Sequence, residues 1–267
     1  MLRLTSKATN PRDLNSLYGI CPCPGSRAWA HGAHLATQVE RIEQSFTALA
    51  APPTFSSPEG GGGPPAKPVV EGATRAPPMR YLSPMSDKRD LRAAMRAHRK
   101  RLAVQSPDAA ARTAAHVADL PPGRLVAVYR AIGSELDADA LSLALERDGR
   151  ELCLPVVIEQ HAPMIFRRWR FGEPLELDVA GVPAPLPLAE AVTPDLILTP
   201  LLAFDAAGGR LGQGGGYYDR TFAALPDALR IGLAYAGQQV DRLPMEGHDI
   251  RLHGVLTETG YTAARKV

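Results

Sequence analysis

A change of composition near residue 85 most constrains what this chain can fold into. Twelve of its 25 prolines lie in the first 84 residues, together with four consecutive glycines at 60–63. Apolar residues show almost no helical or strand period there, apart from a short stretch at 39–49 that could form one helix. Such a segment cannot bury enough apolar surface to offset its chain entropy, so we expect residues 1–84 to be a disordered leader.

The sequence allows several interpretations of residues 1–84. Cys21, Cys23, His31 and His34 are the residue types that bind zinc, but the Cys-x-Cys spacing is tight and no predicted strand or helix frames it. An arginine-bearing, acid-poor start is also compatible with a transit peptide, although no amphipathic helix is evident. The alternative is that translation begins at Met85 and that the leader is an over-extended start.

Residues 85–267 make a stretch of 183 residues, which is enough for one domain with a sizeable core. Ser86 can cap a first helix, and a second helix is predicted to start at Ser106-Pro107-Asp108, with proline at its first position. The first helix would carry basic residues around an apolar face formed by Leu91, Met95, His98 and Leu102.

Apolar runs then alternate with helical patterns. We predict strands at 125–129, 152–154, 164–169, 196–198 and 231–234. A helix at 137–147 would be ended by Gly149, and another would begin at Tyr217. This alternation predicts an α/β fold with a mostly parallel sheet covered by helices on both faces. In such sheets ligands bind beyond the carboxyl ends of the strands.

The most informative loop contains four glycines in five positions, from Gly212 to Gly216. Glycines let backbone N–H groups approach an anion closely, and a helix beginning at Tyr217 would add its dipole. The guanidinium of Arg210 supplies positively charged N–H donors that can bind two phosphate oxygens at once. Asp219 supplies a hard oxygen ligand suited to Mg²⁺ beside phosphates. The pattern favours a phosphate-binding loop, although neither the P-loop nor the Gly-x-Gly-x-x-Gly motif fits, and a flexible surface loop remains the alternative.

Four separated blocks resemble the 5-formyltetrahydrofolate cyclo-ligase family in the same order along the chain. They are Lys88–Arg92, Gly133–Asp137, Asp195–Arg220 and Ile231–Glu258. The resemblance implies a three-layer α/β/α domain of the NagB/RpiA/CoA-transferase type over residues 85–267. It also implies an ATP- and Mg²⁺-dependent enzyme that converts 5-formyltetrahydrofolate to 5,10-methenyltetrahydrofolate through phosphorylation of the formyl oxygen, releasing ADP and phosphate.

Site residues follow from the resemblance by motif position. Arg210 and Asp219 would be catalytic, and Asp219 and Asp249 would hold Mg²⁺. The implied ATP-binding residues are Lys88, Arg89, Asp90, Leu91, Arg92, Arg210, Leu211, Gly212, Gln213, Gly214, Gly215, Gly216, Tyr217 and Tyr218. The implied substrate-binding residues are Arg130, Glu135, Gln213, Gly214, Gly215, Gly216 and Tyr217. Arg130 and Gln213 differ in type from the residues usual in the family, which puts details of the folate pocket in question.

Bulk properties exclude other classes of partner. A formal net charge of +2 gives no general case for nucleic acid, and no apolar run reaches the length of a membrane span. Three cysteines give no disulfide framework. We therefore expect a cytoplasmic monomer that binds 5-formyltetrahydrofolate, including polyglutamylated forms, with no nucleic-acid or membrane partner.

Two other functions stay open at this point. The basic first helix and the glycine loop could belong to an RNA-binding protein, or the chain could be a folate-inactive paralogue with the same fold. Some of the candidate site residues could instead have a structural role. Lys88 and Arg92 could form a solvated helix face, while Glu135 and Asp249 could cap a helix or a turn. Cys153 is expected in the core.

Overall fold

The computed structural model describes residues 88–265. The zinc-type residues Cys21, Cys23, His31 and His34, the helix predicted within 39–49 and the predicted cap Ser86 lie outside this range. Among the described helices, none combines the length and the apolar character needed to cross a bilayer.

Eight strands form one sheet in the order β12-β11-β10-β7-β1-β2-β3-β6. The five central strands are parallel: β1 (Leu125–Ala127), β2 (Glu151–Val156), β7 (Leu196–Pro200), β10 (Leu229–Leu233) and β11 (Gly254–Thr257). The outer strands are antiparallel to their neighbours: β3 (Ile165–Arg168), β6 (Ala191–Val192) and β12 (Gly260–Ala263). The mostly parallel sheet is confirmed, and the sequence did not reveal its antiparallel edges.

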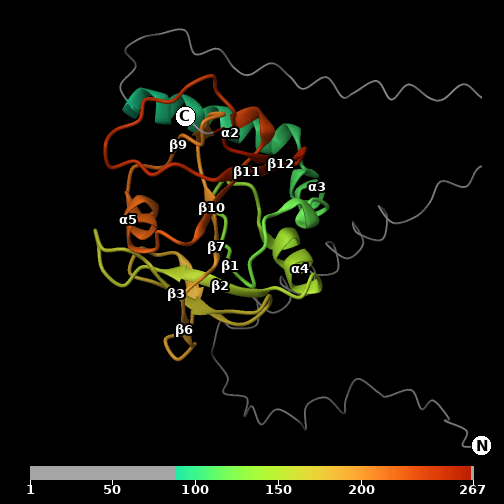
Figure 1. Cartoon of the computed structure of the whole chain (residues 1–267), viewed down its shortest axis with the longest axis vertical. Coiled ribbons are helices and arrows are strands. Elements are labelled where there is room, and N and C mark those ends of the chain that lie inside the picture. Colours follow the sequence, from blue (N-terminus) through green and yellow to red (C-terminus); the bar gives the residue numbers. More distant parts are fainter. Residues whose placement is uncertain (1–87, 266–267) are drawn as a thin grey trace, which may run out of the picture. The chain divides into compact units, whose positions relative to one another are not determined.

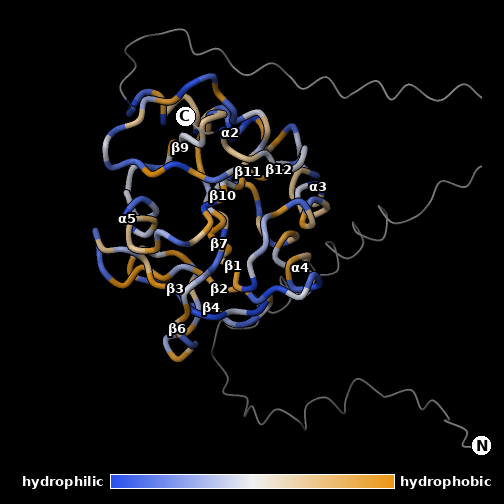
Figure 2. Tube along the Cα trace, viewed as in Figure 1, coloured by the Kyte–Doolittle hydropathy of each residue, from blue (hydrophilic) through white to orange (hydrophobic). Residues whose placement is uncertain are grey.

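Helices cover both faces of this sheet (Figure 1). Phe222 of α5 (Tyr217–Ala224) packs against Ala127, Cys153 and Ile197 on one face. The other face is covered by α3 (Ala109–Ala114) and α4 (Asp139–Arg147). Side chains alternate between the faces of a strand, so strands covered on both sides must be apolar throughout. Figure 2 shows this for β1 and for residues 196–198 of β7, and the α/β fold is confirmed.

The boundaries of two helices differ from the prediction by about two residues. α4 begins at Asp139 rather than Asp137, with Ala138 as its N-cap, and the Asp137 carboxylate just before the helix accepts the backbone N–H of Asp139 at 2.8 Å. Gly149, at φ 82°, follows this helix as predicted. α3 begins at Ala109, so Pro107 precedes the helix instead of occupying its first position. Short 3-10 turns lie at Val117–Asp119 and Ala236–Gln238.

Helix α2 (Lys88–Gln105) lies over the region that follows β7. Its residues Leu91 and Met95 pack with Leu202 and with the hairpin of β8 (Ala203–Phe204) and β9 (Arg210–Leu211). The third buried residue of α2 is Arg99, at 5% exposure. The sequence predicted basic residues around the apolar face of this helix, and the structure shows that Arg99, one of them, is buried. His98 and Leu102, predicted for the apolar face, are only half-buried.

A second hairpin, of β4 (Leu175–Leu177) and β5 (Pro183–Pro185), is anchored beside β2. Asp178 in its turn accepts the N–H groups of Ala180 and Val182 with one carboxylate oxygen. Its other oxygen accepts the N–H of Val157, the residue after β2, at 2.9 Å. The turn is thereby fixed at the carboxyl edge of the sheet.

Candidate active site

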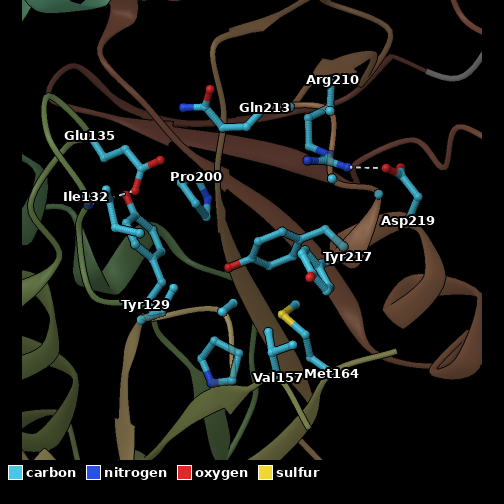
Figure 3. A pocket seen from close by; sticks show the side chains of 18 of the residues that line it. Tyr129, Ile132, Glu135, Val157, Met164, Pro200, Arg210, Gln213, Tyr217 and Asp219 are labelled. Carbon is cyan, nitrogen blue, oxygen red and sulfur yellow. Dashed lines mark hydrogen bonds and ion pairs between the residues drawn. The ribbon is translucent and has the colours of Figure 1, made fainter. Parts of the chain in front are cut away.

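A cavity of about 330 Å³ lies at the carboxyl ends of the parallel strands. Tyr129 follows β1, Val157 follows β2 and Pro200 ends β7, and all three line the cavity together with the glycine loop at 212–216. Figure 3 shows Glu135 on one side and Arg210 with Asp219 on the other. Parallel strands carry their following loops to the same edge, which is why segments far apart in sequence meet here.

The glycine loop leads directly into α5. Gly216 is the N-cap of that helix at φ 67°, and Gly214 has φ 104°; both are conformations that side chains disfavour. Oxygen atoms of the loop accept hydrogen bonds from three arginines. Arg92 donates to Gly212 O, Arg96 to Gln213 Oε1 and Arg220 to Gly215 O, at 3.2, 2.9 and 2.9 Å.

Arg210 and Asp219 form an ion pair in the cavity wall. Nη2 of Arg210 donates to Oδ2 of Asp219 at 2.8 Å, and the Arg210 side chain is only 5% exposed. Tyr218 and Phe222 face the guanidinium with ring centroids at 5.7 and 5.6 Å. Within the described residues, the buried Nε of Arg210 finds no hydrogen-bond acceptor. An unsatisfied buried donor of this kind is suited to an anionic ligand.

Lys88 and Asp249 form a second pair at the cavity. Nζ of Lys88 donates to Oδ2 of Asp249 at 2.6 Å and lies 3.0 Å from Oε1 of Glu246. Burial opposes the charge of Lys88, but hydrogen bonds to Asp249 and Glu246 raise its pKa above the usual range. Burial likewise disfavours the Asp249 carboxylate, but hydrogen bonds from Lys88 and the Glu246 N–H hold its pKa below the usual range. Both groups are therefore charged at neutral pH.

The carboxylates of Asp219 and Asp249 have the right chemistry for Mg²⁺. Both line the cavity, and the N–H of Ile250, the residue after Asp249, lies 3.4 Å from Asp219 Oδ1. Residues 88–265 contain no cluster of three or more His, Cys, Asp or Glu side chains that could hold a metal alone. Mg²⁺ usually takes one or two protein carboxylates and completes its shell with phosphate oxygens and water, so this donor set fits Mg²⁺ bound together with a nucleotide.

Glu135 lies in the loop after β1 and faces the cavity (Figure 3). Its Oε2 accepts the N–H of Ile132 at 3.0 Å, and its Oε1 lies 3.3 Å from Nη1 of Arg99. Sequence reasoning missed Arg99 as a partner. The signal was its spacing, because Leu91, Met95 and Arg99 recur every four residues on one helix face.

Arg130 also lines the cavity, but its guanidinium is paired with Asp139 of α4. The same guanidinium lies 5.8 Å from the ring centroid of Trp169. Burial, together with the charge of Asp137, raises the pKa of Asp139 to about 6 although Arg130 opposes the shift. Arg130 thus stands where the family usually has an apolar residue, and the buried carboxylate of Asp139 is its ion-pair partner.

Three tyrosines contribute to the cavity. Burial raises the pKa values of Tyr129 and Tyr218, and the charge of Glu135 adds to both shifts, so both phenols are neutral. The hydroxyl of Tyr129 donates to Leu136 O at 2.7 Å, which closes the loop that carries Glu135. Tyr217 stacks with Arg220, whose guanidinium carbon lies 5.0 Å from the ring centroid.

Some predicted site residues lie elsewhere. Arg89 and Asp90 are exposed and do not line the cavity, and Leu91 is buried in the cluster beneath α2. His248 is at the cavity rim with a side chain that is 72% exposed. Cys153 is fully buried in β2, where burial raises the pKa of its thiol, as expected of a core cysteine.

Comparison with known proteins gives one family. The model of the 5-formyltetrahydrofolate cyclo-ligase family matches residues 84–258. The 5-formyltetrahydrofolate cyclo-ligases of Escherichia coli and Haemophilus influenzae are 37% and 34% identical to the chain; each alignment covers 49% of this chain, and 76% and 74% of theirs. The solved 5,10-methenyltetrahydrofolate synthetase of Aquifex aeolicus aligns with a TM-score of 0.59 and 29% identity over 67% of this chain and 94% of its own.

Proposed function

The chain belongs to the 5-formyltetrahydrofolate cyclo-ligase family, and we propose that it converts 5-formyltetrahydrofolate and ATP into 5,10-methenyltetrahydrofolate, ADP and phosphate. The observation that carries this proposal is the cavity at the carboxyl edge of the sheet. Lys88, Glu135, the glycine loop and Asp249 come from four separate sequence blocks, and all of them line it.

The chemistry requires activation of the formyl group. Its amide-like oxygen is a poor leaving group, so direct attack by N10 of the folate stalls. Transfer of the terminal phosphoryl group breaks its bond to ADP and makes an imidate phosphate on that oxygen. N10 then attacks the formyl carbon and loses its proton, and phosphate departs with the carbon–oxygen bonding electrons. This route needs no protein nucleophile, only positioning and stabilisation of charge.

The nucleotide side of the cavity would be the wall formed by the glycine loop and its basic neighbours. Arg210 has a buried Nε that is available for a phosphate oxygen, and the N-terminus of α5 adds its dipole. Lys88 and Arg92 also line this wall and would neutralise phosphate charge.

Asp219 and Asp249 would hold Mg²⁺ with the phosphates. When bound, Mg²⁺ neutralises charge on the transferring phosphoryl group. The two carboxylates have a second effect in this chain, because they orient Arg210 and Lys88 through the ion pairs at 2.8 and 2.6 Å.

The folate side would be the opposite wall. A pterin ring presents amino and ring N–H donors, and Glu135 offers carboxylate acceptors that suit them. Val157, Met164 and Pro200 also line the cavity and supply apolar surface, as a flat heteroaromatic ring requires. Arg130 would lie beside the ring with its charge balanced by Asp139.

An absorbance assay for methenyltetrahydrofolate tests the proposal. The full chain is incubated with 5-formyltetrahydrofolate, with and without ATP and Mg²⁺, and product should form only when both are present. Binding of 5-formyltetrahydrofolate without turnover would identify a folate-inactive paralogue. RNA binding that weakens steeply with salt, with no folate binding, would favour the nucleic-acid alternative.

A further inference from the structure

Arg99 is a buried arginine that contacts the cavity-lining residue Glu135, and no part of the proposed reaction accounts for it. Its ion pair with Glu135 joins α2 to the loop after β1, with N···O 3.3 Å and side chains only 6% and 7% exposed. A charge so far from solvent is retained at a large desolvation cost, which a hydrophobic residue would avoid. Its presence among Leu91 and Met95 therefore calls for a role.

Arg99 makes two further hydrogen bonds that link neighbouring strand ends. Its Nε donates to Ser134 Oγ at 3.2 Å, and its Nη1 also donates to Leu201 O at 3.2 Å. Ser134 and Glu135 follow β1, while Leu201 follows β7, and these strands are paired in parallel. One planar guanidinium thus fixes the loop after β1 against the end of β7. The single ammonium group of a lysine cannot reproduce this fork.

These contacts fix the orientation of the Glu135 carboxylate. Arg99 holds its Oε1 and the N–H of Ile132 holds its Oε2, so both oxygens are fixed from the protein side. Each carboxylate oxygen accepts about two hydrogen bonds, so each retains acceptor capacity toward the cavity. A carboxylate that is already oriented loses less entropy when a ligand donates to it.

We propose that Arg99 is a positioning residue for the folate, which holds Glu135 oriented toward the pterin without touching the substrate itself. This inference rests on the proposed function. It assigns Arg99 to folate recognition alone, whereas Lys88 and Arg92, the basic residues of the same helix that line the cavity, are assigned to the nucleotide.

The experiment compares Arg99→Met, Arg99→Lys and the control Lys100→Met in the full chain. Lys100 is the next residue of α2 and is exposed. Arg99→Met should weaken 5-formyltetrahydrofolate binding and raise its KM by about tenfold or more, while ATP binding measured without folate changes less than about threefold. Arg99→Lys should recover part of the folate affinity, and Lys100→Met should match wild type in both. Arg99→Met combined with Glu135→Gln should bind folate no more weakly than Glu135→Gln alone.

Each outcome decides the matter. If wild type neither binds 5-formyltetrahydrofolate nor forms product, the proposed function fails and this inference with it. If wild type is active but Arg99→Met has unchanged folate affinity, or loses ATP affinity to the same extent, Arg99 is structural and only the inference is overturned. If Arg99→Met does not fold, Arg99→Lys decides. A loss of folate affinity alone, at unchanged thermal stability, supports the inference. An equal loss of ATP affinity, or no loss of folate affinity, overturns it.

Discussion

Lys88 Nζ and Asp249 Oδ2 are 2.6 Å apart, although 161 positions separate the two residues in the chain. One is a predicted phosphate-binding residue and the other a predicted Mg²⁺ ligand. Because each side chain is close to the other's charge, a ligand that engages one changes the environment of both. We therefore expect nucleotide and metal binding to be coupled through this pair.

The first prediction concerns Asp219 and Asp249. Asp219→Asn keeps the shape and can still accept a hydrogen bond from Arg210, but it removes the charge that would hold Mg²⁺. ATP-dependent turnover should collapse, whereas the free energy of unfolding should fall by no more than about 2 kcal/mol. Asp249→Asn should affect the same step, so the double variant should be clearly less than additive in kcat/KM.

Turnover as a function of Mg²⁺ concentration and thermal unfolding measure these effects. The matched control is Asp227→Asn, an exposed residue in the segment after α5, which should leave both unchanged. If Asp219→Asn turns over within a few-fold of wild type, Asp219 is not a metal ligand.

The second prediction concerns Glu135→Gln. The amide keeps the size but lacks the charge that pairs with Arg99 and replaces one acceptor by a donor. Binding of 5-formyltetrahydrofolate should weaken by at least about tenfold, or roughly 1.4 kcal/mol. ATP binding without folate should barely change, because Arg210 and Asp219 lie on the opposite side of the cavity from Glu135 (Figure 3). Calorimetry with each ligand separates the two, and the exposed Glu159→Gln is the control.

The third prediction concerns the backbone of the glycine loop. Gly216 has φ 67°, and a Cβ atom there would lie 2.6 Å from Nη1 of Arg220, the side chain that holds Gly215 O. Gly216→Ala should destabilise the fold by about 1 kcal/mol or more and raise the KM for ATP. Gly247→Ala is the control for stability, because it has an ordinary φ and open space around its Cβ position. Equal melting temperatures for the two variants would contradict the prediction.

The fourth prediction concerns pH and Asp139. Burial, followed by the charge of Asp137, raises its pKa to about 6 in the folded protein, whereas the unfolded chain takes up this proton near pH 4. The folded state therefore binds more protons between these values, and the contribution of Asp139 to stability is present below about pH 4 and lost as pH rises through 6.

Asp139→Asn stays neutral and lacks this dependence. The free energy of unfolding of the variant minus that of wild type should rise by roughly 1–3 kcal/mol between pH 4 and 6.5. Denaturant titrations across this range measure the difference. The exposed Asp241→Asn serves as control, and a flat difference for Asp139→Asn would show that its pKa is ordinary.

The sequence by itself determined the features that depend on local pattern. Apolar runs such as 196–198 lie in central strands because a strand covered on both faces must be apolar throughout. The glycine loop and the start of α5 at Tyr217 were also predictable, since glycines exclude regular structure wherever they cluster. The family followed from the order of the four blocks.

Only the tertiary structure decided which charges meet. In the sequence, Arg99 is one of many basic residues of α2. In the structure it is buried, and a buried charge needs a partner, which is Glu135, 36 residues away in the chain. Arg130 differs in type from the residue usual in the family, and only the structure shows that it forms an ion pair with Asp139. Residue type and spacing describe a side chain's own segment, whereas the partner of a buried charge is set by how distant strands and helices pack. That packing is a property of the whole fold; the spacing of Leu91, Met95 and Arg99 indicates only that they share the buried face of α2.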